Sequence, residues 1–168
     1  SKGDVVRIAT DASSDTVFKG SMCFVAGNGD YRLRTRETKA STDELELEAL
    51  TLALKYLLKV GARKAVIESD SVAALEAVEQ IVHKRGSKAS RPGRTWRGVS
   101  SGARSRFQQA WGDIQGQCEV DIRRVLGHAG DPLNRAADQI AYMGLRAIAH
   151  PMKQSRETLR EGIQKALL

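Results

Sequence analysis

The alternation of apolar and polar residues predicts three strands in the first quarter of the chain. Residues 5–10 are mostly apolar and β-branched, which is typical of a buried strand, and we expect this strand to end at Asp11. Residues 20–26 and 30–38 are predicted to form the next two strands. The segment 27–30 between them reads Gly-Asn-Gly-Asp, and Asn-Gly between two strand patterns is a strong hairpin signal. The alternation indicates that this hairpin buries one face and exposes the other.

The remainder of the chain predicts helices around two more strands. A capping box over Ser41–Glu44 begins the first helix, which Gly61 ends, and Asp131-Pro132 begins a later one. After the first helix, the expected elements are a strand over 65–69, a helix over 71–83, a helix over 104–115, a strand over 119–126, a helix to about residue 149 and an amphipathic helix over 154–167. A hairpin meander followed by strand–helix crossovers predicts an α/β fold with helices packed on a mixed sheet. We expect one domain over residues 1–150 and a helical extension over 151–168.

The composition excludes several classes of protein. A chain of 168 residues with 41% hydrophobic and 28% charged residues is typical of a globular domain and excludes wholesale disorder. No run approaches the roughly 20 apolar residues of a membrane span, and the first residues lack the apolar segment of a signal peptide. Cys23 and Cys118 are too few for a disulfide framework or a zinc knuckle. We therefore expect a cytoplasmic monomer that does not bind membranes.

The net charge of +7 is concentrated in one segment. Residues 81–124 hold ten basic and three acidic residues, whereas the segments on either side are close to neutral. Within it, residues 84–106 contain eight Lys or Arg and no acid, and we name them the basic connector. A local basic block favours a polyanionic partner that binds at one place on the surface. A solubility patch or a disordered, solvated loop would have the same composition.

The first helix places its two central acids on different faces. At 100° per residue, Glu46 shares a direction with Leu50 and Leu57, so we expect it to face the sheet. Glu48 falls on the opposite side with Lys55, and we expect it to be a solvent-exposed acid that pairs with such a lysine. A buried acid is costly unless a cation or hydrogen-bond donors meet it. The alternative role for Glu46 is an acid that stabilises the helix N-terminus.

Three further acids are candidates for the same site. Asp11 and Asp70 each directly follow a predicted strand, and Asp138 shares a partly apolar helix face with Asn134. Strand ends of an α/β sheet commonly meet at one edge, although Asp also favours strand ends and helix caps for local reasons. Four inward-facing acids indicate a cation, and oxygen ligands alone favour Mg²⁺ or Mn²⁺ over zinc. Two such ions would support in-line displacement at phosphorus.

One histidine lies close to these acids in the sequence. His128 stands in a predicted loop between Gly127 and Gly130, ten residues before Asp138. Its ordinary pKa would let it transfer a proton or loosen a metal-bound product. The alternative is a surface histidine with no chemical role.

These residues resemble a known family, the type 1 ribonucleases H, over roughly residues 5–149. The resemblance lies in four motifs in the family's order: Thr10-Asp11-Ala12-Ser13; Glu46 followed by Ala49, Ala53 and Leu54; Ser69-Asp70-Ser71; and Gly127-His128-Ala129-Gly130-Asp131-Pro132-Leu133-Asn134-Arg135-Ala136-Ala137-Asp138. The last motif is the most specific. The chain departs from the family at Ala12, where many members have Gly, and at Thr42-Asp43, where amides are usual.

The resemblance implies a ribonuclease H-like fold with a five-stranded mixed sheet in the order 3-2-1-4-5. It implies an endonuclease that cleaves the RNA strand of RNA–DNA hybrids and leaves 5′-phosphate and 3′-hydroxyl ends. It also implies two Mg²⁺ ions, replaceable by Mn²⁺. Carried over to this chain, Asp11 would contact both ions, Glu46, Asp70 and Asp138 would complete their ligands, and His128 would assist proton transfer or product release.

The resemblance also suggests where the hybrid binds. The basic connector falls where some members carry a basic, Trp-containing handle, and the residues similar in kind are Arg91, Arg94, Trp96, Arg97, Arg104 and Arg106. Contacts to the RNA 2′-hydroxyls in the minor groove are expected from Ser13, Thr42, Ser71 and Asn134. Two alternatives remain: a non-catalytic nucleic-acid-binding domain of the same fold, and a relative that cleaves DNA.

Overall fold

Five strands form one mixed sheet in the computed structural model, which describes residues 4–15, 18–37, 39–83, 99–126, 130–150 and 156–168. The strands are β1 (Val6–Ser14), β2 (Gly20–Ala26), β3 (Tyr31–Arg36), β4 (Lys64–Ser69) and β5 (Glu119–Arg124). Their order is β3-β2-β1-β4-β5, as expected from the family resemblance. The hairpin strands pair antiparallel, whereas β1, β4 and β5 run parallel.

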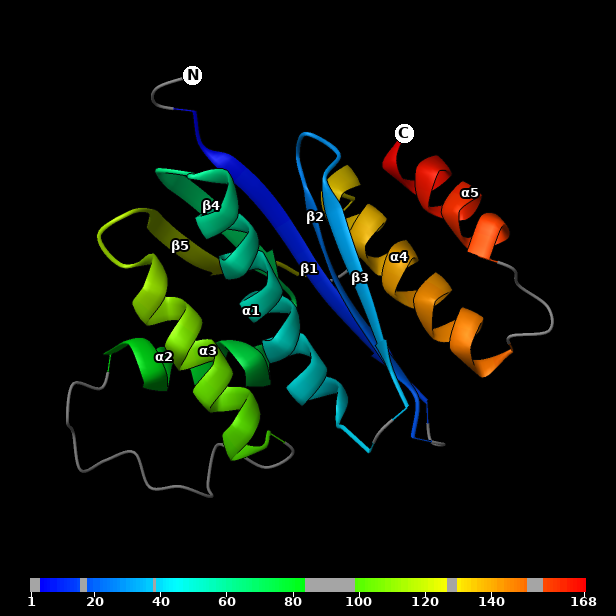
Figure 1. Cartoon of the computed structure of the whole chain (residues 1–168), viewed down its shortest axis with the longest axis horizontal. Helices are drawn as coiled ribbons and strands as arrows, with labels where there is room; N and C mark the ends of the chain where they lie inside the picture. Colours follow the sequence, from blue (N-terminus) through cyan, green and yellow to red (C-terminus); the bar gives the residue numbers. More distant parts are fainter. Residues whose placement is uncertain (1–3, 16–17, 38, 84–98, 127–129, 151–155) are drawn as a thin grey trace.

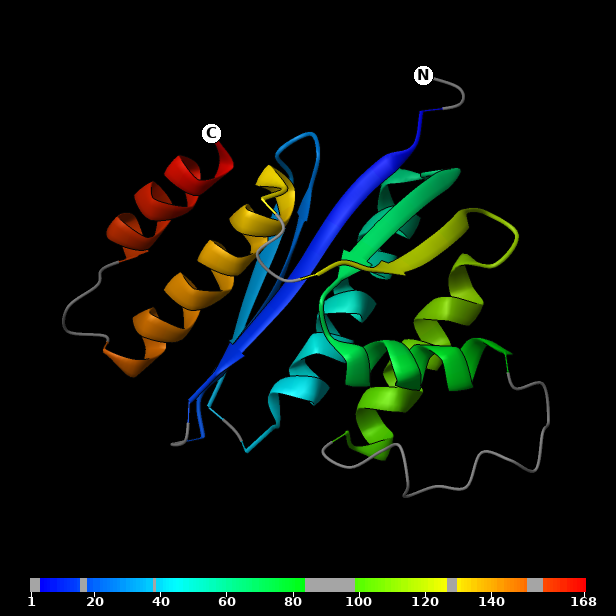
Figure 2. The same cartoon turned by 180° about the vertical axis from the view of Figure 1, so that it is seen from behind.

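Helices cover both faces of this sheet (Figures 1 and 2). One face packs against α1 (Thr42–Val60) and α2 (Val72–His83), on which α3 (Ser101–Ile114) packs in turn, and the other face packs against α4 (Pro132–Ala149). The C-terminal helix α5 (Arg156–Leu167) lies against α4. Each face therefore has its own apolar core, and the central strand β1 contributes to both.

Two element boundaries differ from the expectation. The first strand does not end at Asp11, because β2 continues to pair with β1 as far as Ser14. The connector also ends earlier than predicted: α3 begins at Ser101, where the Ser100 hydroxyl accepts the Ala103 N–H and caps the helix. Residues 101–106 are therefore helical, and residues 84–98 lie outside the described part of the chain.

The predicted ends of α1 are confirmed. Ser41 accepts the Glu44 N–H at 3.1 Å, and Gly61 ends the helix with a left-handed φ of 68°. The Glu44 carboxylate accepts the Ser100 N–H at 2.7 Å. The first turns of α1 and α3 are therefore tied together.

The prediction that Glu48 is a solvent-exposed acid is wrong. Its side chain is buried, Arg36 of β3 donates to one carboxylate oxygen, and Arg106 of α3 donates to the other at 2.7 Å. The sequence pattern shows which side of α1 meets the sheet, but α3 packs over the side that was expected to face water. Glu48 therefore joins β3, α1 and α3 through a buried ion-paired carboxylate.

We expect Glu48→Gln to destabilise the fold. The substitution removes the negative charge that accepts hydrogen bonds from Arg36 and Arg106. A hydrogen bond to a charged group contributes about 1.5–3 kcal/mol to the free energy of unfolding. Because both arginines can turn to water, we expect the free energy of unfolding to fall by about 2 kcal/mol. Urea unfolding measures this loss, and an unchanged midpoint would contradict the structural role assigned to the carboxylate.

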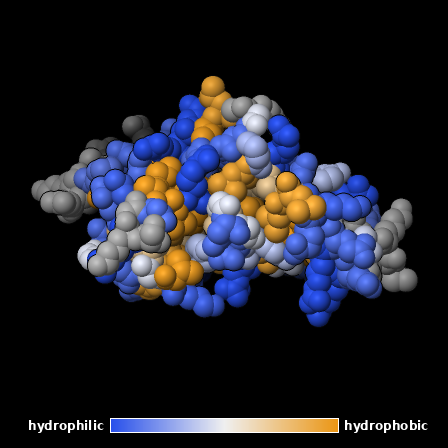
Figure 3. Space-filling model, turned by 90° about the horizontal axis from the view of Figure 1, so that it is seen from above, coloured by the Kyte–Doolittle hydropathy of each residue, from blue (hydrophilic) through white to orange (hydrophobic). Residues whose placement is uncertain are grey.

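The surface has mixed polarity. Seen from above in Figure 3, hydrophobic side chains gather in patches towards the middle of the view and hydrophilic ones cover most of the rest. Among the described residues, no helix is both long enough and apolar enough to cross a bilayer.

Candidate active site

Three acids from distant parts of the sequence converge beside the centre of the sheet. Carboxylate oxygens of Asp11, Glu46 and Asp70 all lie within 4.8 Å of one another. Asp11 and Glu46 are buried, whereas Asp70 is exposed. We name these three residues the acidic cluster.

The sheet itself creates room for this cluster. The parallel pairing of β1 with β4 ends at Ala9 and Glu68, while β1 continues alongside β2 alone. Asp11 therefore lies inside β1 but beyond its last partner on β4. Asp70 follows the end of β4, and the next residue, Ser71, caps α2 by accepting the Ala74 N–H. Glu46 enters from the sheet-facing side of α1, as its helical position predicts.

Burial dominates the electrostatics of the cluster. It raises the pKa of Asp11 to about 7, and the negative charge of Asp70 adds to the rise. It raises the pKa of Glu46 to about 10, again with a contribution from neighbouring carboxylates. Oxygen Oε2 of Glu46 is buried and meets no hydrogen-bond donor among the described residues. Such a carboxylate can be ionised at neutral pH only if a cation stabilises the negative charge in place of the missing hydrogen-bond donors.

The cluster opens into a hollow of about 170 Å³ between the sheet and α4. Asp11 and Asp70 line it from the sheet, and Asn134 and Asp138 line it from α4. Asp138 is exposed at this rim, and its hydrogen-bonding contact helps to raise the pKa of Asp11. The expectation that all four acids face inward is therefore right for Asp11 and Glu46, whereas Asp70 and Asp138 lie at the mouth.

The residues expected to contact nucleic acid are only partly placed. Asn134 lines the hollow. The hydroxyls of Thr42 and Ser14 are hydrogen-bonded to each other, and Ser13 lies opposite Ser21 in the β1–β2 ladder. Arg104 is half-buried on α3, and Arg106 is engaged with Glu48. Outside the described residues lie Arg91, Arg94, Trp96, Arg97 and His128.

One residue that positions the site was missed by the sequence reasoning. Arg7 of β1 donates to both Glu68 of β4 and Asp131 at the start of α4, each at 2.8 Å. Asp131 caps α4 by accepting the Leu133 N–H, and together these bonds lower its pKa. Arg7 therefore fixes the start of α4, and with it Asn134 and Asp138, relative to the sheet. The signal in the sequence was an arginine among the mostly apolar residues of the predicted strand 5–10.

A family model and a solved structure are similar to this chain. The family model described as RNase H matches residues 3–146. The chain is similar to the solved N-terminal RNase H domain of Rv2228c from Mycobacterium tuberculosis, determined as a fusion with maltose binding protein. The two are 19% identical with a TM-score of 0.61, over 88% of this chain and 97% of that one, so this likeness concerns the fold. No curated protein sequence matches the chain.

Proposed function

This chain belongs to the RNase H family, and from that premise we propose that it is an endonuclease that hydrolyses the RNA strand of RNA–DNA hybrids. The observation that carries the proposal is the acidic cluster, in which Asp11, Glu46 and Asp70 come within 4.8 Å. Three carboxylates so close, two of them buried, are unstable as charged groups without a cation. The cluster therefore supports metal-dependent chemistry over binding alone.

The metal-ligand atoms that the acidic cluster offers fit a hard divalent ion. All are carboxylate oxygens, which favour Mg²⁺ with Mn²⁺ as a substitute, and the unsatisfied Glu46 Oε2 offers a buried ligand atom. We propose that Asp11, Glu46, Asp70 and Asp138 hold two such ions. When bound, the ions would activate a water and stabilise the leaving oxygen, giving 5′-phosphate and 3′-hydroxyl ends.

The remaining roles, in substrate binding and proton transfer, would belong to the chain's own residues. Asp11 and Glu46 form the buried base of the site, while Asp70 and Asp138 lie at the mouth that a phosphodiester must enter. Asn134 lines the same hollow, and we propose that its amide contacts the strand bound there. Contacts to 2′-hydroxyls would give the preference for RNA. We assign proton transfer to His128 on the strength of its motif.

We expect the basic connector to contribute to substrate binding. Replacing Arg91, Arg94 and Arg97 with Ala should raise KM, and the slope of log affinity against log salt should fall by about 0.9 for each phosphate that is no longer neutralised. Steady-state cleavage at several salt concentrations measures both effects. As a matched control, the three exposed cations Arg156, Arg160 and Lys165 of α5 lie outside the connector and are replaced by Ala in the same way. An unchanged KM and salt slope in the connector variant would show that the segment does not touch the hybrid.

The proposed function is tested by offering three labelled duplexes, RNA–DNA, RNA–RNA and DNA–DNA, with Mg²⁺ and with chelator. We expect Mg²⁺-dependent cutting of the RNA in the hybrid and of nothing else. Binding of the hybrid without cutting would favour a non-catalytic domain of the same fold. Cutting of the DNA duplex would favour a DNA-directed nuclease.

A further inference from the structure

A second surface of the molecule, unrelated to the acidic cluster, is lined by basic residues. Two adjoining hollows of about 300 and 670 Å³ lie between β3 and α1, and both are lined by Arg34, Leu52 and Lys55. We name the two hollows together the β3–α1 groove. None of its lining residues lines the hollow beside the acidic cluster.

One wall of this groove is the edge strand of the sheet. Arg32, Arg34 and Arg36 are alternate residues of β3, so their side chains lie on the same face. Their partners across the β2–β3 ladder include Phe24 and Met22, which belong to the core beneath α1. The three arginines therefore line the α1 side of the strand, spaced about 6.8 Å apart along it.

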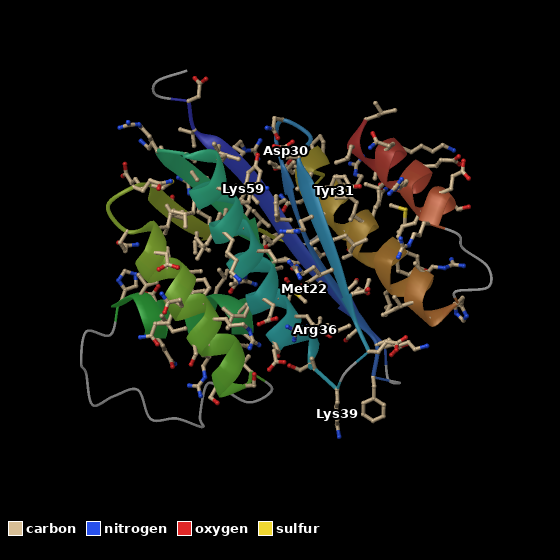
Figure 4. The ribbon with its side chains drawn as sticks, in the orientation of Figure 1. Met22, Asp30, Tyr31, Arg36, Lys39 and Lys59 are labelled. Atoms are coloured by element: carbon tan, nitrogen blue, oxygen red, sulfur yellow. The ribbon has the colours of Figure 1, made fainter. Side chains whose placement is uncertain are left out.

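The opposite wall is the second half of α1. Lys55 and Lys59 lie one turn apart on this helix and line the larger hollow. Figure 4 shows Met22 in the space between α1 and β3, with Arg36 towards one end and Lys59 towards the other. Cations therefore border the groove from two elements that face each other.

Most of this positive charge has no protein counter-charge. Six basic and two acidic residues line the groove, and both acids already have partners. Asp30 accepts hydrogen bonds from the Tyr56 hydroxyl at 2.6 Å and from Asn28, while Glu48 binds Arg36 and Arg106. The cations that remain are exposed and form no ion pair within the described part of the chain: Arg32, Arg34, Lys55 and Lys59.

We propose that the β3–α1 groove binds the backbone of a single nucleic-acid strand. Rows of cations on both walls suit successive phosphates, and the floor offers the partly buried ring of Tyr56, which rests on the buried ring of Phe24 with the two centroids 4.8 Å apart. A basic groove with aromatic side chains is the common design for sequence-tolerant single-strand binding. This inference does not rest on the proposed function, because the groove and the acidic cluster share no residue.

An acidic peptide is the competing occupant. It would pair with β3 as an additional strand, because β3 is an edge strand of the sheet in the described structure. Only two of the four unpaired cations lie on β3, and the other two come from α1, across the groove. Their placement therefore favours a chain that lies between strand and helix over one that extends the sheet.

Fluorescence anisotropy with a labelled oligothymidylate in EDTA tests this proposal without any contribution from cleavage. The variant is Arg34→Glu with Lys55→Glu, two exposed groove cations, and the matched control is Arg160→Glu with Lys165→Glu on α5. Both carry the same change of net charge, and both keep the basic connector. We expect the groove variant to bind about tenfold more weakly, with a salt slope reduced by about 1.4 because two phosphates of a single strand are no longer neutralised. The control should bind as the unaltered protein does.

Two outcomes would overturn the proposal: unchanged binding of the oligonucleotide by the groove variant, or an equal loss in both variants. In the first case, weakened binding of polyglutamate by the groove variant would identify the acidic peptide as the occupant. Thermal unfolding of both variants establishes that they are folded. If the groove variant unfolds early, the Arg34→Gln and Lys55→Gln pair gives the same test with a smaller change of charge. A protein that binds the oligonucleotide through the groove but cleaves no hybrid would leave this inference standing and refute the proposed function.

Discussion

Glu46→Gln is expected to reduce the rate of hybrid cleavage by about 10²–10³-fold or more, with hybrid binding largely retained. Removing one group that only supports a metal ligand already costs about 10–100-fold, and removing one stabilising group at the reaction centre costs about 10²–10³-fold. Glu46 supplies a buried carboxylate to the acidic cluster, and the amide keeps its shape but not its charge. Single-turnover cleavage and filter binding separate the two effects.

The matched control for this prediction lies two residues along the same helix. Glu48 is also buried, but Arg36 and Arg106 already neutralise its carboxylate, and it faces α3 instead of the acidic cluster. We expect Glu48→Gln to lower stability and to leave cleavage close to that of the unaltered protein. If cleavage survived Glu46→Gln but not Glu48→Gln, the active site would lie on the side of α1 that faces α3. That result would contradict the assignment of the acidic cluster.

The second large effect concerns stability in the absence of divalent ions. We expect the metal-free protein to become less stable as the pH rises from 5 to 8. The pKa values of Asp11 and Glu46 are raised in the folded protein, to about 7 and about 10, so the folded state holds protons that the unfolded state releases from about pH 4 upward. The stability gained from the protonated forms is therefore present at low pH and lost as the pH rises.

The size of this effect follows from the linkage. Each unit of pKa shift corresponds to about 1.4 kcal/mol, so we expect a loss on the order of a few kcal/mol, or several degrees in Tm. Asp30 and Asp131 do not contribute in this window, because their lowered pKa values place their titration below the ordinary carboxyl range. Calorimetry in EDTA at several pH values measures the trend.

Glu46→Gln and Mg²⁺ should both reduce this pH dependence. The amide cannot ionise, so the variant should be more stable than the unaltered protein at pH 8 in EDTA. Mg²⁺ should raise the Tm of the unaltered protein more at pH 8 than at pH 5, because the ion binds the charged carboxylates. A Tm that is flat across this range in EDTA, or that Mg²⁺ does not change, would contradict the electrostatic role assigned to the cluster.

Much of the site was predictable from local patterns. The position of Glu46 on the sheet-facing stripe of α1 identified it without reference to any partner. Asp70 could be placed equally well, because it follows the end of the apolar run that forms β4. The positions of Glu46 and Asp70 both depend only on the residue pattern of one element. The four acids also matched the family's motifs in order.

What the sequence could not show depends on contacts between distant elements. The burial of Glu48 requires α3, which lies more than fifty residues further along the chain. The extension of β1 past Asp11 depends on how far β2 pairs with it. In the β3–α1 groove, the arginines of β3 are visible as the polar positions of a hairpin, but nothing local indicates that Lys55 and Lys59 face them.

Metal-dependent cleavage by the acidic cluster is best tested by comparing the unaltered protein with Asp70→Asn on one labelled RNA–DNA hybrid in Mg²⁺, with the ends of every fragment identified. We expect RNA fragments with 5′-phosphate and 3′-hydroxyl ends from the unaltered protein. From the variant we expect bound but uncut hybrid, since Asp70 is the exposed member of the acidic cluster. Undiminished cutting by Asp70→Asn, or cutting that persists in chelator, would contradict the assignment of the cluster as the active site.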